Sequence, residues 1–157
     1  MAQAVDQSIK RFPVAEMEEL SLRGLNIQQQ WADKIYSGEK TVEARKKEFP
    51  SYTDGNPLWV IETPDKPKRG KRSVAEITGV IRFEQDPAEY ADYEEWRRDF
   101  KRHRVEEGSV FDWNPRKSRM FAWGIAEARR LAVPIPAPSV RGMIGSKEHR
   151  AIVTFEK

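Results

Sequence analysis

A predicted helix that ends at a glycine and passes directly into a charged strand constrains this chain more than any other feature. Asn26 and Gln29 have the spacing of a capping box, so we predict a helix over residues 26–36. Gly38 suits the position after a helix end, because glycine enters the left-handed region of backbone space without a Cβ penalty. The segment therefore predicts a tight helix–strand junction.

Beyond the glycine the pattern changes to a period of two, which is typical of a strand over residues 41–47. Val42 and Ala44 then point to one face, while Glu43 and Arg45 share the other. Lys40 lies at the start of this strand. A lysine, a glutamate and an arginine meeting at such a junction favour a binding or catalytic site over an ordinary solvated surface.

The rest of the chain predicts more strands than helices. Apolar and β-branched segments predict strands, and the order of acidic before basic residues in 86–105 predicts an inserted helix that begins at Asp86. Prolines from Pro134 onward predict a stiff connector. The expected strands cover residues 20–27, 41–47, 58–62, 73–84, 121–133 and 151–155. This pattern predicts an α+β fold built on a small, closed or nearly closed barrel. Residues 1–18 are expected to be an extension, and 19–157 the domain.

The composition narrows the classes of function. The 157 residues carry a formal net charge of only +3, so any preference for polyanions must come from where the charges lie. Cysteine is absent, which excludes disulfides, thiol nucleophiles and cysteine zinc sites. His103 and His149 lack the spacing of a metal pair, and no apolar run is long enough to span a membrane. We therefore expect a cytoplasmic protein that needs no metal ion or cofactor.

The junction also carries a family resemblance. It resembles the activating signal cointegrator homology (ASCH) domain, whose opening pattern is a short strand, a Gln-x-x-Trp-Ala-like helix start and Gly-x-Lys-x-x-Glu-x-Arg. The matching positions are Leu25-Asn26-Ile27-Gln28-Gln29-Gln30-Trp31-Ala32, followed by Ile35, Gly38, Lys40, Val42, Glu43 and Arg45. A weaker echo follows at Phe121-Ala122-Trp123-Gly124-Ile125, Leu131, Pro134 and Arg141-Gly142. The resemblance implies a mixed PUA-like β-barrel, with flanking helices, that recognises RNA or another nucleic acid.

Lys40, Glu43 and Arg45 are the central candidates for a cleft that holds a nucleotide or an unstacked base. Lysine and arginine can hold a phosphate, and arginine can also stack on a base, while glutamate can accept a proton from a base amine. The alternative is purely structural, with Glu43 and Arg45 forming an ion pair that braces the barrel.

Further candidates have structural alternatives of their own. Trp31 and Trp123 could stack on a base or pack in the core, and Tyr36 could donate a hydrogen bond to a ligand or support the helix end. A basic loop is the best candidate for contacts with phosphate, and its alternative is a solvated loop. Its residues are Lys68, Arg69, Lys71 and Arg72. Arg141 beside Gly142 could reach the cleft.

These features predict a module that binds RNA, another single-stranded nucleic acid or a nucleotide-like ligand. The alternative is a small hydrolase acting on RNA or on an acylated pyrimidine nucleoside, because relatives with the same Gly-x-Lys turn resemble such enzymes. Lys40 and Glu43 would then be catalytic. Glu43 stands where those nucleoside hydrolases have a hydroxyl residue, which argues against that substrate.

Overall fold

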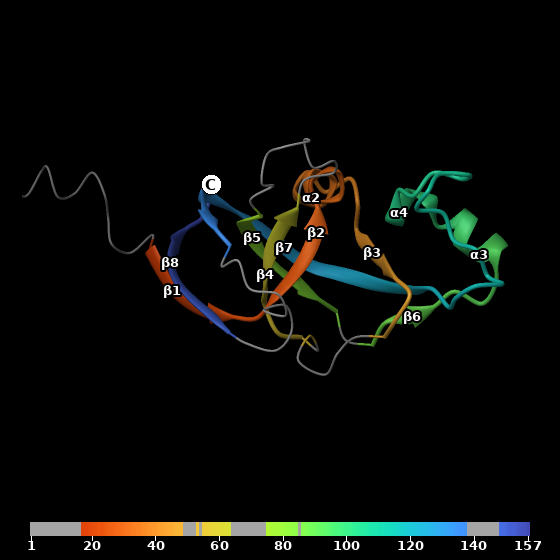
Figure 1. The fold of residues 1–157 in the computed structure, drawn as a ribbon, viewed down its shortest axis with the longest axis horizontal. Helices are drawn as coiled ribbons and strands as arrows, with labels where there is room; N and C mark the ends of the chain where they lie inside the picture. Colours follow the sequence, from red (N-terminus) through yellow and green to blue (C-terminus); the bar gives the residue numbers. More distant parts are fainter. Residues whose placement is uncertain (1–16, 49–52, 54, 64–74, 85, 138–147) are drawn as a thin grey trace, which may run out of the picture.

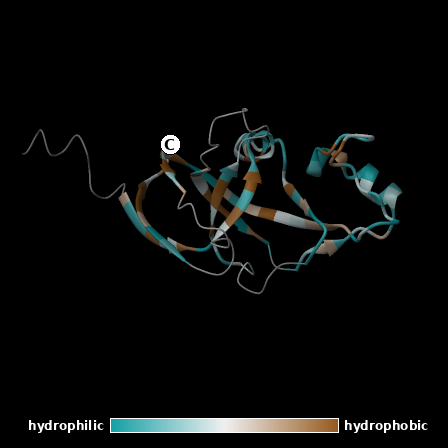
Figure 2. Cartoon of the chain, in the orientation of Figure 1, coloured by the Kyte–Doolittle hydropathy of each residue, from teal (hydrophilic) through white to brown (hydrophobic). Residues whose placement is uncertain are grey.

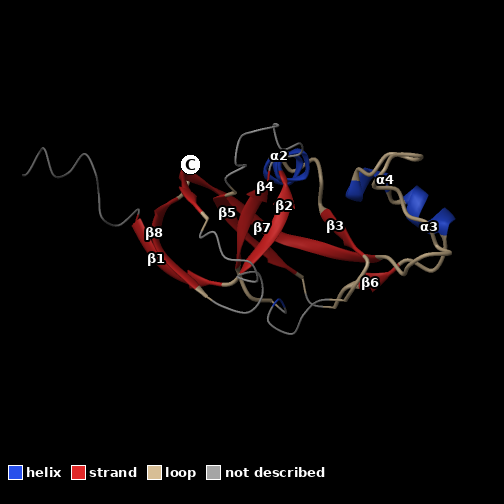
Figure 3. Cartoon of the chain, in the orientation of Figure 1, coloured by secondary structure: helices blue, strands red, loops and turns tan. Residues whose placement is uncertain are grey.

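The fold is dominated by strands, with three short helices in the described part of the chain (Figures 1 and 3). The structure is a computed structural model, and it describes residues 17–48, 53, 55–63, 75–84, 86–137 and 148–157. The strands are β1 (Met17–Leu22), β2 (Gly24–Gln28), β3 (Val42–Arg45), β4 (Leu58–Thr63), β5 (Glu76–Phe83), β6 (Ala88–Glu89), β7 (Phe121–Pro136) and β8 (His149–Thr154). The helices are α2 (Gln29–Tyr36), α3 (Tyr93–Arg98) and α4 (Phe100–His103).

Most strands join one mixed sheet in the order β2-β4-β5-β7-β3, and β6 also pairs with β7. The β2–β4 pair is parallel and the other pairs are antiparallel. Strand β7 runs along much of the length of the molecule in Figure 1, pairing with β5 along one part and with β3 along another. A separate two-stranded sheet pairs β1 with β8. The expected mixed α+β class is confirmed.

Closure of the barrel is not confirmed. Strands β2 and β3 stand at the two ends of the sheet order, and no pairing of the described strands joins them. A side chain crosses this opening instead, because Arg45 Nη2 of β3 donates a 2.7 Å hydrogen bond to the carbonyl oxygen of Asn26 in β2. We call the opening between these two strands the β2–β3 seam.

The helix–strand junction forms largely as predicted, but its helix begins later. Gln28 is still paired with Thr63, so the backbone stays extended to that point, and α2 begins at Gln29. No side chain caps this helix start, and the predicted capping box is therefore wrong. At the other end Gly38 has a φ of 82°, and its amide donates to the carbonyl of Ile35 at 3.1 Å, which confirms the predicted glycine stop.

The predicted continuous helix over residues 86–105 is wrong. Residues 88–89 form β6, because Ala88 is paired with Ala122 of β7, and the helical part is divided into α3 and α4. The N-cap is Asp92 rather than Asp86, with its carboxylate accepting a 2.8 Å hydrogen bond from the amide of Glu95. Strand β7 likewise continues to Pro136, into the segment expected to be a connector from Pro134 onward. The register with β5 is irregular between Arg130 and Ile135, so a missing amide at Pro134 breaks no regular ladder.

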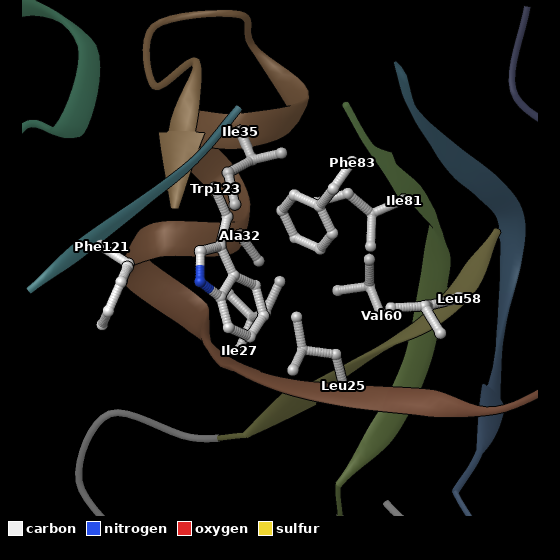
Figure 4. Packing of buried hydrophobic residues seen from close by; sticks show 10 residues of the cluster. All are labelled: Leu25, Ile27, Ala32, Ile35, Leu58, Val60, Ile81, Phe83, Phe121 and Trp123. Carbon is white, nitrogen blue, oxygen red and sulfur yellow. The ribbon is translucent and has the colours of Figure 1, made fainter. Parts of the chain in front are cut away.

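The domain is held together by three clusters of buried hydrophobic residues. One lies between α2 and the sheet (Figure 4), a second between β3 and the α3–α4 segment, and a third beneath the β1–β8 pair. In Figure 2 brown hydrophobic residues recur along the central strands, whereas α2 and α3 are largely teal. The cluster in Figure 4 comprises Leu25, Ile27, Ala32, Ile35, Leu58, Val60, Ile81, Phe83, Phe121 and Trp123.

Two sequence predictions concern the limits of the described structure. The division between an extension over 1–18 and a domain over 19–157 stays a prediction, because residues 1–16 lie outside the described part. Strand β1 begins at Met17, just before the predicted start of the domain. Within the described residues, no helix combines the length and the hydrophobicity that crossing a membrane requires.

Candidate functional site

A cavity of about 580 Å³ lies at the β2–β3 seam. Its walls come from the ends of β2 and β3, from α2, and from the loop that follows α4. The lining includes three kinds of side chain: charged residues of and around β3, aromatic residues, and amides of β2. Its members include Asn26, Gln28, Trp31, Lys40, Glu43, Arg45, Lys46, Lys47, Val110, Phe111, Asp112 and Trp123. The cavity thus brings together five of the residues that the sequence pointed to.

Lys40 is buried beneath this cavity, with an exposed fraction of only 2%. Its Nζ donates a 2.6 Å hydrogen bond to the carbonyl oxygen of His103 and lies 3.6 Å from Glu43 Oε1. The ammonium group also lies 4.8 Å from the centre of the Trp31 ring. Burial lowers the pKa of Lys40, whereas the neighbouring carboxylate of Glu43 acts in the opposite direction. Lys40 therefore connects the helix–strand junction to α4 and holds Glu43 in place.

Glu43 and Arg45 form a pair on one face of β3, as the period of two predicted. Glu43 Oε2 accepts hydrogen bonds from Arg45 Nη2 at 2.8 Å and from Arg45 Nε at 3.2 Å. Glu43 is buried, whereas the exposed fraction of the Arg45 side chain is 32%. The same guanidinium lies 5.7 Å from the Trp123 ring and reaches Asn26 across the seam. The pair thus combines a structural bridge with a partly accessible cation, so both interpretations of these residues have a physical basis.

Two tryptophans form part of the cavity wall. Trp31 is half-buried on α2 and meets Phe111 edge to face, with ring centroids 5.4 Å apart. Trp123 of β7 is buried against Phe83, also edge to face at 5.4 Å. The indole Nε1 of Trp123 donates a 3.1 Å hydrogen bond to the carbonyl oxygen of Lys47, which fixes the ring beside the end of β3. Both rings contribute to packing and also line the cavity.

Tyr36 does not lie with these residues. Its hydroxyl is 2.8 Å from Thr78 Oγ1 of β5, and its ring is covered by the guanidinium of Arg130 at 4.4 Å. Burial raises the pKa of the Tyr36 phenol well above its ordinary value. This arrangement supports the structural alternative for Tyr36. The predicted contributions of Lys68, Arg69, Lys71, Arg72 and Arg141 lie outside the described residues.

Comparison with known proteins places the chain in a family. Its sequence matches the ASCH domain over residues 25–135, which is well over half of its length. The chain belongs to the ASCH domain family. The match contains every cavity residue named above, and it confirms the resemblance seen at the helix–strand junction together with the PUA-like superfamily. No match is found among curated proteins.

Solved structures support the ASCH fold. The crystal structure of ASCH from Zymomonas mobilis is similar with a TM-score of 0.52 and 20% sequence identity, covering 71% of this chain and 70% of that one. Two variants of the Zymomonas mobilis protein, one with a serine changed to alanine and one with a tyrosine changed to phenylalanine, match with the same TM-score and identity. At this identity the likeness shows a shared fold.

Sequence reasoning missed several residues that line the ASCH cavity, among them Lys46, Lys47, Val110, Phe111 and Asp112. The lysines follow β3 directly, and their position after a charged strand was a usable signal. Phe111 and Asp112 come from a loop more than 60 residues further along the chain. Because no local pattern links that loop to β3, only the tertiary structure brings these residues to the site.

The buried ring of His103, whose backbone carbonyl accepts the Lys40 hydrogen bond, should make the folded protein less stable in acid. Its Nε2 lies 2.7 Å from the carbonyl oxygen of Trp96, and its Nδ1 accepts a 2.9 Å hydrogen bond from the amide of Val105, so the ring is held as the neutral Nε2–H form. Burial lowers the pKa of His103 below its ordinary value of 6.5. The unfolded chain therefore takes up this proton first, and the associated stability is lost as the pH falls from about 7 through the folded-state pKa.

We expect the free energy of unfolding, measured by urea titration between pH 8 and pH 5, to fall more steeply in the wild type than in His103→Gln. The slope should approach about 1.4 kcal/mol per pH unit where only the unfolded chain binds the proton. His149→Gln serves as the control, because it removes the other histidine and leaves the buried ring in place. Equal slopes in the wild type and His103→Gln would contradict the assignment.

Proposed function

We propose that this ASCH domain binds single-stranded RNA by holding one unstacked nucleotide in the cavity at the β2–β3 seam. The observation that carries the proposal is that Glu43, Arg45, Trp31 and Trp123 line the same cavity. Its volume of about 580 Å³ falls within the range of pockets that enclose small organic ligands. Base recognition requires hydrogen-bonding groups and a stacking surface, and this set supplies both.

Glu43 is suited to read the edge of a base. Its Oε2 accepts both hydrogen bonds from Arg45, whereas its Oε1 lies at an ion-pair distance of 3.6 Å from Lys40 Nζ. A carboxylate oxygen has more than one lone pair, so Oε1 can accept a hydrogen bond from a further donor. The amino group of cytosine, adenine or guanine is such a donor, whereas uracil has no amino group. The proposed ligand is therefore a nucleotide whose base carries an amino group.

Arg45 and the lysines that follow it would supply the cationic part of the site. The guanidinium of Arg45 is partly exposed beside Trp123, where it can stack on a base or donate to a phosphate. Lys46 and Lys47 are exposed and also line the cavity. Flexible lysines at the rim favour contacts with the RNA backbone, which add affinity without reading sequence.

The geometry gives the hydrolase alternative less support. In that hypothesis Lys40 would activate the attacking group, which requires its ammonium to reach the substrate. The Nζ instead donates to the His103 carbonyl and is almost completely buried. A role for Lys40 in positioning Glu43 agrees better with these contacts.

A comparison of nucleotide affinities tests the proposal. We expect cytidine monophosphate to bind at least about tenfold more tightly than uridine monophosphate, because uracil presents a carbonyl oxygen, which repels the Glu43 carboxylate, at the position where cytosine presents its amino group. Isothermal titration calorimetry at fixed salt measures both constants. In Glu43→Gln the ratio should fall toward one, since a glutamine amide can both donate and accept. Absence of binding by any nucleoside monophosphate would overturn the proposal.

A further inference from the structure

We infer that Val110 and Phe111 form an apolar wedge that stacks against the base next to the nucleotide in the cavity. This inference rests on the proposed function and extends it from one nucleotide to two. The side chains belong to the turn Ser109–Asp112, in which the amide of Asp112 donates to the carbonyl of Ser109 at 3.1 Å. We refer to the pair Val110 and Phe111 as the wedge.

The composition of this turn is unusual. The central positions of a β-turn are usually taken by glycine, proline, asparagine, aspartate or serine, because these residues suit turn geometry and solvent. Here they are a valine with 92% exposure and a phenylalanine with 38% exposure. Large apolar side chains that are exposed together at the rim of a cavity favour contact with an apolar surface of a ligand.

The turn is also held firmly in place. Asp112 Oδ2 accepts hydrogen bonds from the Tyr93 hydroxyl at 2.6 Å and from the Gly108 amide at 2.8 Å, while Oδ1 accepts from Trp96 Nε1 at 2.9 Å. Although burial alone would raise the pKa of Asp112, these donors lower it. A turn fixed in this way loses little conformational entropy when it binds a ligand.

The position of the wedge selects a base as its ligand. Phe111 continues the aromatic wall of the cavity, because its ring meets Trp31 at 5.4 Å, and Val110 extends outward from it. Lys46 and Lys47 line the same cavity and provide positive charge for the phosphate between two nucleotides. Every nucleobase presents an apolar face, and apolar side chains stack on such faces in many nucleic-acid complexes. Two side chains are too few for a protein interface, which needs about 800 Å² from each partner.

The test compares a trinucleotide with a nucleoside monophosphate. In wild-type protein, the trinucleotide CAA should bind at least about fivefold more tightly than cytidine monophosphate, and Val110→Ser should reduce this ratio toward one. Val110→Trp should increase the ratio, because it enlarges the stacking surface. A trinucleotide with 2-aminopurine next to the cytidine should show fluorescence quenching on binding that Val110→Ser diminishes. Val133→Ser, a valine with 72% exposure on β7, is the matched control.

The outcomes separate this inference from the proposed function. If the monophosphate binds but the trinucleotide binds no more tightly, the wedge is wrong and the cavity assignment stands. If wild-type protein binds neither ligand, both fail. An unchanged ratio in Val110→Ser and Val110→Trp also overturns the wedge. A wild-type dimer in sedimentation that Val110→Ser abolishes would also overturn the wedge, because it would identify the pair as a contact between copies of the chain.

Discussion

Replacing Lys40 with methionine should lower the free energy of unfolding by about 3 kcal/mol, because it breaks a buried ion pair from one side. Methionine keeps an unbranched side chain, shorter by one heavy atom, but donates no hydrogen bond. The carbonyl of His103 would lose its 2.6 Å partner, and the buried Glu43 would lose a neighbouring cation. The midpoint of thermal unfolding should fall by roughly 10 °C. Urea titration and thermal denaturation followed by circular dichroism measure the two quantities.

Lys101→Met provides the matched control for this change. Lys101 lies on α4 with its side chain exposed, two residues before the carbonyl that Lys40 contacts. Surface substitutions of this kind usually change stability by less than about 0.5 kcal/mol. Equal stabilities of Lys40→Met and Lys101→Met would show that the ammonium group contributes nothing to folding, and Lys40 would then become a candidate for direct contact with the ligand.

Replacing Arg45 with lysine should reduce the affinity for cytidine monophosphate at least about tenfold, although the charge is kept. A lysine cannot form the two hydrogen bonds to Glu43 Oε2 and a third to the Asn26 carbonyl from one planar group. The carboxylate would therefore be less well oriented, and the flat cation beside Trp123 would be lost. Isothermal titration calorimetry gives the affinity. The cost to folding should be smaller, about 1 kcal/mol, because Arg45 is partly exposed.

Arg82→Lys is the appropriate comparison, because Arg82 pairs with Glu127 and does not line the cavity. This variant should bind cytidine monophosphate with the affinity of the wild type. An Arg45→Lys protein that is folded and binds normally would leave Arg45 with a structural role alone, as a brace between β2 and β3.

The parts of this site that the sequence predicted are those determined by neighbouring residues. The glycine stop at Gly38 depends on one residue's backbone freedom, and the alternation that places Glu43 beside Arg45 depends on strand geometry. The burial of Lys40 could not be predicted in this way. Its hydrogen-bond acceptor lies 63 residues later in the chain, and no local pattern connects the two.

Errors in the predicted fold arose where pairing between distant segments overrides local preference. The charge order in residues 86–105 favoured a continuous helix, but pairing of Ala88 with Ala122 holds the beginning of that segment in a strand. Similarly, pairing of Gln28 with Thr63 delays the start of α2. The contribution of Phe111 to the cavity depends on a loop whose place is set by the hydrogen bonds of Asp112. Such contacts have no signature in a single sequence.

The side-chain bridge between β2 and β3 has a consequence for how ASCH domains could diversify. A hydrogen-bonded ladder fixes two strands at a spacing of about 4.8 Å, whereas a long side chain with several rotatable bonds can join strands over a range of separations. We therefore expect the width of the entrance to depend on the rotamer of Arg45, whose guanidinium bridges the two strands. Substitution at this position should then change the size of ligand that enters the cavity while the strand order stays the same.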